Sequence, residues 1–193
     1  MATGNGLQLV RTVTGKTASI RPYFVPATYG TALFVGDPVR LISTTGTMDA
    51  LNEVPCVAAA ATGEIILGVI VGFEPDAANL LSANYKAASK ARYVLVCDDP
   101  DAVYQVQEDA VGGAVTAALV GAMANANFVV AAGSTVTGLS GVMLDSSTTT
   151  ASAADLKIIG VARDSVNAAA ASGGAVLEVT ILSSAIKATD SQS

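Results

Sequence analysis

The carboxylates of Asp98, Asp99 and Asp101 stand close enough in sequence to gather around Ca²⁺ or Mg²⁺, cations that prefer oxygen ligands. An EF-hand loop starting at Asp98 would need glycine at its sixth position, where this chain has Val103. With Pro100 between them, the aspartates are also typical of a turn that ends a strand, because proline fixes φ and aspartate side chains bond nearby backbone. We therefore expect a turn here, with a bound structural cation as the alternative.

Two short motifs are similar to parts of known catalytic or nucleotide sites. Gly15-Lys16-Thr17 has the ending of a phosphate-binding loop, but the glycine required five positions earlier is replaced by Val10. The sequence after Thr17 also predicts a strand, where that motif needs a helix. Gly138-Leu139-Ser140-Gly141 is similar to a nucleophile elbow without the final glycine spacing. Neither motif predicts nucleotide binding or a reactive serine.

Three glutamates, Glu64, Glu74 and Glu178, stand at strand starts, turns or alternating positions, which is typical of solvated faces. A glycosidase would need two carboxylates to converge in a cleft, which their spacing does not establish. The chain contains no histidine and therefore lacks the commonest general base, metal ligand and pH switch. A Ser-Lys or Thr-based scheme stays compatible with the composition, without local support. We expect no catalytic residue, no cofactor, no metal and no enzymatic activity.

The two cysteines, Cys56 and Cys97, both stand in apolar surroundings. A disulfide framework in a small secreted scaffold would need more cysteines in a shorter chain. A buried thiol in such surroundings behaves as a small hydrophobic side chain. We expect two free buried thiols, and a single disulfide is the alternative.

The composition is that of a folded chain with few charges. Of the 193 residues, 51% are apolar and 13% charged, and the charged share is about half of the usual one. The formal net charge of −6 argues against a nucleic-acid-binding protein, because neutralising phosphates needs a basic face. Residues 1–45 carry a net +3 and residues 93–156 a net −7. These parts could pair with each other or with neighbouring copies, or form an unevenly charged solvated surface.

No targeting or membrane segment is evident. The chain starts without a basic and apolar leader pattern, which argues against a secretory signal. The longest strong apolar run, residues 65–73, is far shorter than the about 20 residues of a membrane-spanning helix. We expect a soluble protein that is made in the cytoplasm and has no membrane partner.

Most of the chain alternates between apolar and polar residues with a period of two, which predicts strands. The predicted strands are Ile20–Val25, Pro38–Ser43, Glu64–Phe73, Tyr93–Cys97, Ala102–Glu108, Asn127–Ala132, Thr135–Asp145, Leu156–Arg163 and Ala175–Leu182. Short strands at this spacing, closed by Gly, Pro, Asp or Ser, are typical of sandwiches and barrels. We predict an all-β fold, either a sandwich or an antiparallel β-barrel.

One segment, Ala110–Asn125, is rich in alanine, but its glycines weaken a helix, so we expect at most one short helix there. Residues 146–154 and 167–174 have the low complexity of loops. We expect three parts: an extended N-terminal arm over residues 1–18, a single β-rich domain over 19–187, and a flexible tail over 188–193.

Three segments of the chain are informative when they are taken in order. Residues 29–41 are YGTALFVGDPVRL, residues 91–108 are ARYVLVCDDPDAVYQVQE, and residues 138–147 are GLSGVMLDSS, followed by LKIIGV at 156–161. In this order they resemble a family of small structural proteins of tailed bacteriophages that decorate or cement the head. The resemblance spans most of the chain, residues 7–183, and departs at 167–174, where the family has a charged or Asn-rich segment. Its motifs mark a fold, so no site residue carries over.

The resemblance implies a virion protein on the outer surface of the capsid, folded as an antiparallel β-barrel or a jelly-roll-like sandwich. It would bind the expanded shell, clamp neighbouring major capsid subunits and so stabilise the head. Its partners would be the major capsid protein and other copies of itself, as a dimer or trimer, with no nucleic acid and no membrane. The basic segment 7–21 could be an arm that adds a strand to a neighbour's sheet edge. Small side chains and the lack of histidine also suit a passive clamp.

Two other classes remain as alternatives. A receptor- or carbohydrate-binding β module of a phage tail or fibre usually relies on aromatic platforms, and this chain has no Trp, 4 Phe and 5 Tyr. A major shell or tail-tube subunit is the other class. The shell fold of tailed phages carries a long spine helix, and no helical pattern of that length occurs in this sequence.

Overall fold

The computed structural model describes residues 4–42, 54–75, 83–149, 154–162 and 174–186, and its elements are mostly strands. One sheet contains five antiparallel strands in the order β1-β7-β12-β11-β8. Their bounds are β1 Gln8–Thr12, β7 Ala102–Gln107, β12 Val176–Ile181, β11 Leu156–Val161 and β8 Asn125–Ala126. A short antiparallel pair forms a separate ladder, β9 Phe128–Val129 and β10 Met143–Leu144.

The second sheet also contains five antiparallel strands, in the order β2-β6-β5-β3-β4. Their bounds are β2 Ile20–Val25, β6 Arg92–Cys97, β5 Gly68–Phe73, β3 Pro38–Leu41 and β4 Val57–Ala59. A parallel bridge joins Phe24 of β2 to Cys56, which immediately precedes β4. The N–H of Phe24 also donates to the carbonyl of Pro55 at 3.0 Å. These contacts curl the second sheet without closing it into a barrel.

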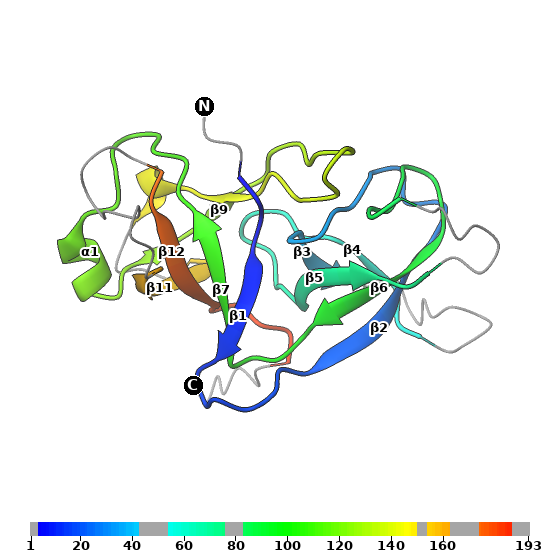
Figure 1. Cartoon of the computed structure of the whole chain (residues 1–193), viewed down its shortest axis with the longest axis horizontal. Helices are drawn as coiled ribbons and strands as arrows, with labels where there is room; N and C mark the ends of the chain where they lie inside the picture. Colours follow the sequence, from blue (N-terminus) through cyan, green and yellow to red (C-terminus); the bar gives the residue numbers. More distant parts are fainter. Residues whose placement is uncertain (1–3, 43–53, 76–82, 150–153, 163–173, 187–193) are drawn as a thin grey trace.

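The two sheets lie side by side, and the chain crosses between them from β1 to β2 and again from β6 to β7 (Figure 1). The predicted all-β fold is confirmed, and the arrangement is consistent with a sandwich. The barrel alternative is wrong. Closure requires the first and last strands of a sheet to pair. β1 and β8 lie at opposite edges of the first sheet, and in the second sheet β2 and β4 are not neighbours, because the bridge from Phe24 reaches Cys56, just before β4.

The segment predicted as an extended arm is part of the fold. β1 pairs with β7 from Gln8 opposite Gln105 to Thr12 opposite Ala102. Leu7 is 1% exposed and belongs to the apolar core. Alternating apolar residues at the start of the chain therefore form an edge strand, because pairing with β7 buries one face of that strand. The expected boundary at residue 18 falls in the connection between β1 and β2, and residues 188–193 lie outside the described part of the chain.

Two apolar clusters fill the interior. The larger one lies against the first sheet and includes Tyr104, Leu156 and Leu177, together with Val69 and Cys97 from the second sheet. Since residues of both sheets share this cluster, the sheets pack against each other. The smaller cluster is formed around the second sheet by Tyr23, Val25, Leu33, Val39, Val57, Leu67, Ile70, Val94 and Val96.

The helix prediction is confirmed, because the alanine-rich segment holds one five-residue helix, α1 (Ala117–Gly121). Thr116 caps its start, with its side chain accepting from the N–H of Leu119. A 3₁₀ turn, Ser146–Thr148, lies within the predicted loop 146–154. Most of the other predicted loop, 167–173, is outside the described residues.

The predicted strands occur with shorter bounds in most cases, and β2 has the predicted ones. The largest disagreement is residues 135–142, predicted as part of a strand, where the structure has a loop before β10. Three strands were not predicted: β1, β4 and β8. β4 and β8 have 3 and 2 residues, and a period of two cannot be recognised over such lengths.

Candidate interaction surface

The acidic segment after β6 forms a turn, as predicted. The N–H of Ala102 donates to the carbonyl of Asp99 at 3.1 Å, and the N–H of Asp101 donates to the Asp99 carboxylate at 2.9 Å. The Asp99 side chain also accepts from the N–H of Ser19 at 3.2 Å. Within the described residues, no group of acidic or cysteine side chains has the arrangement of a metal site. In this turn the Asp99 carboxylate therefore binds backbone N–H groups.

Asp98, directly after β6, binds two side chains of the neighbouring strand β2. Its carboxylate is 2% exposed and accepts from the Arg21 guanidinium at 2.5 Å and from the Tyr23 hydroxyl at 2.6 Å. Burial and the hydrogen bond to Asp98 raise the pKa of Tyr23, and the same carboxylate raises the pKa of Arg21. The basic N-terminal and acidic central parts of the sequence thus pair within the chain at this point. Arg11 of the basic part instead pairs with Glu178 of β12, which lies outside the acidic central part, at 2.7 Å.

The two short motifs from the sequence have structural roles. Gly15-Lys16-Thr17 lies in the connection from β1 to strand β2, where Gly15 has a φ of 72°. Ser140 is 1% exposed, and its hydroxyl oxygen accepts from the N–H of Val142 at 3.0 Å. Residues around Ser140 form no strand-to-helix elbow, because Leu139 bridges to Val35 and β10 follows.

The three glutamates are spread over different elements. Glu64 lies between β4 and β5, where it accepts from Arg40 at 2.9 Å and from the N–H of Ala61 at 2.7 Å. Glu178 is on β12, and Glu74 immediately follows β5. Two of the three are therefore engaged in ion pairs at separate places.

Neither cysteine forms a disulfide and both are buried, which confirms the prediction. Burial raises the pKa of the Cys97 thiol, so this thiol stays protonated and unreactive at neutral pH.

Three exposed apolar residues lie where the chain passes from one sheet to the other. Val10, Val13 and Ile20 are 44%, 60% and 48% exposed, and we call these three residues the edge surface. Val10 is on β1 and Ile20 is on β2, the strands at the edges of their sheets. In Figure 1 the connection that holds Val13 runs along the bottom of the view, from the lower end of β1 to β2. Sequence reasoning placed this stretch in an arm and missed that pairing with β7 fixes it in place.

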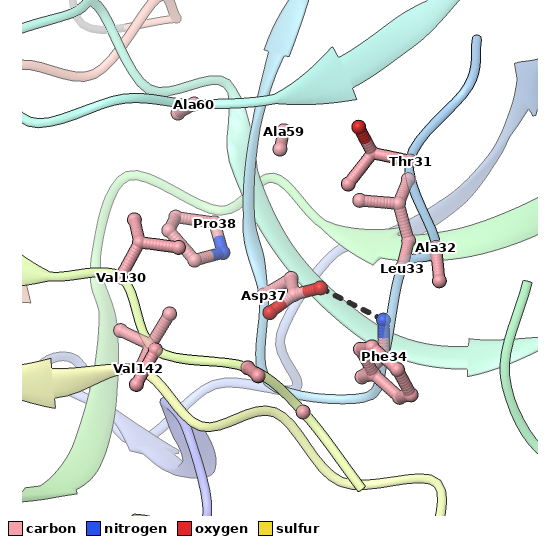
Figure 2. A pocket seen from close by; sticks show the side chains of 13 residues that line it. Thr31, Ala32, Leu33, Phe34, Asp37, Pro38, Ala59, Ala60, Val130 and Val142 are labelled. Carbon is pink, nitrogen blue, oxygen red and sulfur yellow. Dashed lines mark hydrogen bonds between the residues drawn. The ribbon is translucent and has the colours of Figure 1, made fainter. Parts of the chain in front are cut away.

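A pocket of about 400 Å³ opens elsewhere, between the second sheet and the segment that follows β9. Its walls come from residues 31–34, 37–38, 59–60, 130–133 and 142. Figure 2 shows the Asp37 carboxylate among these side chains, with the N–H of Phe34 donating to it at 2.8 Å. Burial raises the pKa of Asp37, while hydrogen bonds from Ser140 and the Phe34 backbone lower it in part. In the sequence, Asp37 stands between Gly36 and Pro38, a combination typical of a turn, and nothing there indicates a pocket.

Comparison with family models, with curated proteins and with solved structures finds no match to this chain. In the part of the chain that the structure describes, no helix combines the length and the apolar character needed to cross a membrane. The chemical character of the surfaces themselves is therefore the basis for a functional proposal.

Proposed function

We propose that this chain is a virion structural protein that binds the outer surface of a bacteriophage capsid. It clamps neighbouring major capsid subunits and so stabilises the expanded head. The three-segment sequence resemblance supports this role, and the all-β fold, which is consistent with a sandwich, is compatible with it. The observation that carries the proposal furthest is the edge surface, where apolar side chains are presented on two edge strands.

Edge strands have backbone N–H and C=O groups that can pair with another chain, and proteins normally protect such edges. Within the described part of the chain, β1 has one strand neighbour, β7. Val10 and Val13 add exposed apolar area beside it. A partner strand could hydrogen-bond to β1 while its side chains cover these residues, which is the usual mode of strand addition.

Many identical copies on a symmetric shell act together, so a modest affinity per copy is enough to reinforce it. The shell would then be stabilised by the large number of bound copies and not by a high affinity of each one. A fixed edge strand also loses less conformational entropy on binding than a free arm does. The contact with the neighbouring subunit would therefore be made by strand β1, which is already ordered by its pairing with β7, and not by an extended arm.

The copy number in purified virions tests the role directly. We expect on the order of hundreds of copies, in a simple ratio to the major capsid protein, because symmetric shells have equivalent sites. Quantitative mass spectrometry against that protein measures the ratio. A few copies to a few dozen would instead favour a tail or fibre module, and complete absence from particles would contradict the proposal.

A substitution in the edge surface tests the mode of binding. We expect Val13→Asp to weaken binding to expanded capsids by about tenfold, the effect of losing one apolar contact and burying a charge. Co-sedimentation with capsids that lack the protein gives the affinity. The matched control is Val111→Asp, because Val111 is 61% exposed and lies outside the edge surface. Equal binding by Val13→Asp and the unchanged chain would show that this surface does not face the capsid.

A further inference from the structure

The pocket beside the second sheet combines apolar walls with one charged group. Leu33, Phe34, Pro38, Val130 and Val142 contribute apolar side chains to its lining. Among the lining residues, all of which the structure describes, Asp37 alone carries a charge. Its volume of about 400 Å³ is within the range of small-molecule sites, which is roughly 300–1,000 Å³.

The Asp37 carboxylate retains hydrogen-bonding capacity. One oxygen accepts from the Phe34 N–H at 2.8 Å, and the Ser140 side chain supplies a second hydrogen bond. An ionised carboxylate offers about four acceptor positions, so two protein donors leave room for further ones. In this partly buried setting water compensates the negative charge less than it does in solution. A ligand that brings a positive charge and N–H donors therefore matches what the carboxylate lacks.

The rest of the pocket determines the shape of such a ligand. Its walls are mostly apolar around the charge, and the side chains of Ala59, Ala60, Ala131 and Ala132 are small, so they leave space for a methylene chain. A carboxylate ligand would be repelled by Asp37, and a guanidinium is a wide planar fork. A compact ammonium group on a flexible apolar stem matches both the negative charge of Asp37 and the apolar walls.

We propose that this pocket binds the ammonium end of a primary alkylamine, with Asp37 as its anionic partner and the apolar walls around its carbon chain. The ligand is either a free alkylamine or the lysine side chain of another protein, since both present the same group. The site is separate from the edge surface and does not depend on the capsid role.

The experiment titrates the full chain, isotopically labelled, with n-pentylammonium chloride at neutral pH and follows backbone amide shifts by NMR. We expect saturable shifts at Phe34 and Gly133, and at least tenfold weaker binding after Asp37→Asn. Asp101→Asn is the matched control, because Asp101 is exposed in the turn after β6. The neutral n-pentanol should bind at least fivefold more weakly than the amine. Equal binding by alcohol and amine, or by Asp37→Asn and the unchanged chain, would overturn the proposal.

Three further measurements complete the test. Binding should decrease as the pH falls through the raised pKa of Asp37, because the ionised form is the one that attracts the amine. Ala132→Phe, at an exposed rim position, should block the pocket without changing Asp37, and it decides the outcome if Asp37→Asn does not fold. Unchanged binding by Ala132→Phe would contradict the site.

Titration with Nα-acetyl-lysine methylamide separates the two sources of the ammonium group. Binding as tight as that of pentylammonium indicates a lysine side chain of another protein, and much weaker binding indicates a free amine.

Discussion

Replacing Glu108 with alanine is expected to lower the free energy of unfolding by about 4 kcal/mol, because two buried backbone donors lose a charged acceptor. Glu108 is 1% exposed, and its carboxylate accepts from the N–H of Val115 at 2.6 Å and from the N–H of Ala175 at 3.1 Å. These donors lie in two different segments, before α1 and before β12. Glu108 therefore ties two connections to the end of β7.

The expected loss corresponds to a decrease in Tm of roughly 8–16 °C for a chain of this size. Urea unfolding gives the free energy, and a thermal melt gives Tm. Glu108→Gln should cost about half as much, because the amide keeps one acceptor oxygen but points N–H groups at the other donor. The matched control is Glu178→Gln, whose ion pair with Arg11 is on the surface and should contribute less than about 1 kcal/mol. If the free energy of unfolding of Glu108→Ala is within 1 kcal/mol of that of the unchanged chain, Glu108 does not anchor these two segments.

Replacing Gly68 with alanine is expected to destabilise the fold by about 3 kcal/mol or to prevent soluble expression. A Cβ at this position would lie 2.2 Å from the carbonyl oxygen of Cys97 and 2.9 Å from its carbonyl carbon. Both atoms belong to the backbone of β6, and Val69 pairs with Cys97 in the same ladder. The clash can be relieved only by separating β5 from β6, which form the centre of the second sheet.

The same strand provides the control. A Cβ at Gly72 would meet the Leu95 side chain at 3.7 Å, an ordinary contact, and the φ of Gly72 is outside the left-handed region. Gly72→Ala should therefore change the free energy of unfolding by less than about 1 kcal/mol, in either direction. Urea unfolding of both variants measures the difference, and equal stabilities would contradict the close approach of β5 to β6.

The two sheets share one local feature that is faintly visible in the sequence. The pairing register shifts between Ile70 and Gly72 in β5, and again between Ile158 and Gly160 in β11. Each strand then pairs with the next strand in the chain, β6 or β12. In the sequence, IILGV at residues 65–69 is similar to IIGV at residues 158–161. The structure places the matching bulges at 70–72 and 158–160, because pairing determines which residues oppose each other.

Local chemistry by itself determined the fold class and the places where the chain turns. The alternating residues of Ile20–Val25 form β2 with the predicted bounds. Asp99 and Asp101 form the predicted turn. The glycines around the alanine-rich segment limit α1 to five residues. These features depend on backbone preferences and on neighbours within a few residues, which are present in the sequence itself.

Only the tertiary structure decided which edges pair and which residues meet. An amphipathic stretch at residues 7–12 is equally suited to an arm and to an edge strand, and pairing with β7 made it a strand. The pocket around Asp37 joins residues from 31 to 142, and no local pattern relates them. Glu108 is an anchor only because packing brings the N–H of Ala175 to it. Such contacts between distant segments follow from burial of the whole core, so a reading of local sequence cannot locate them.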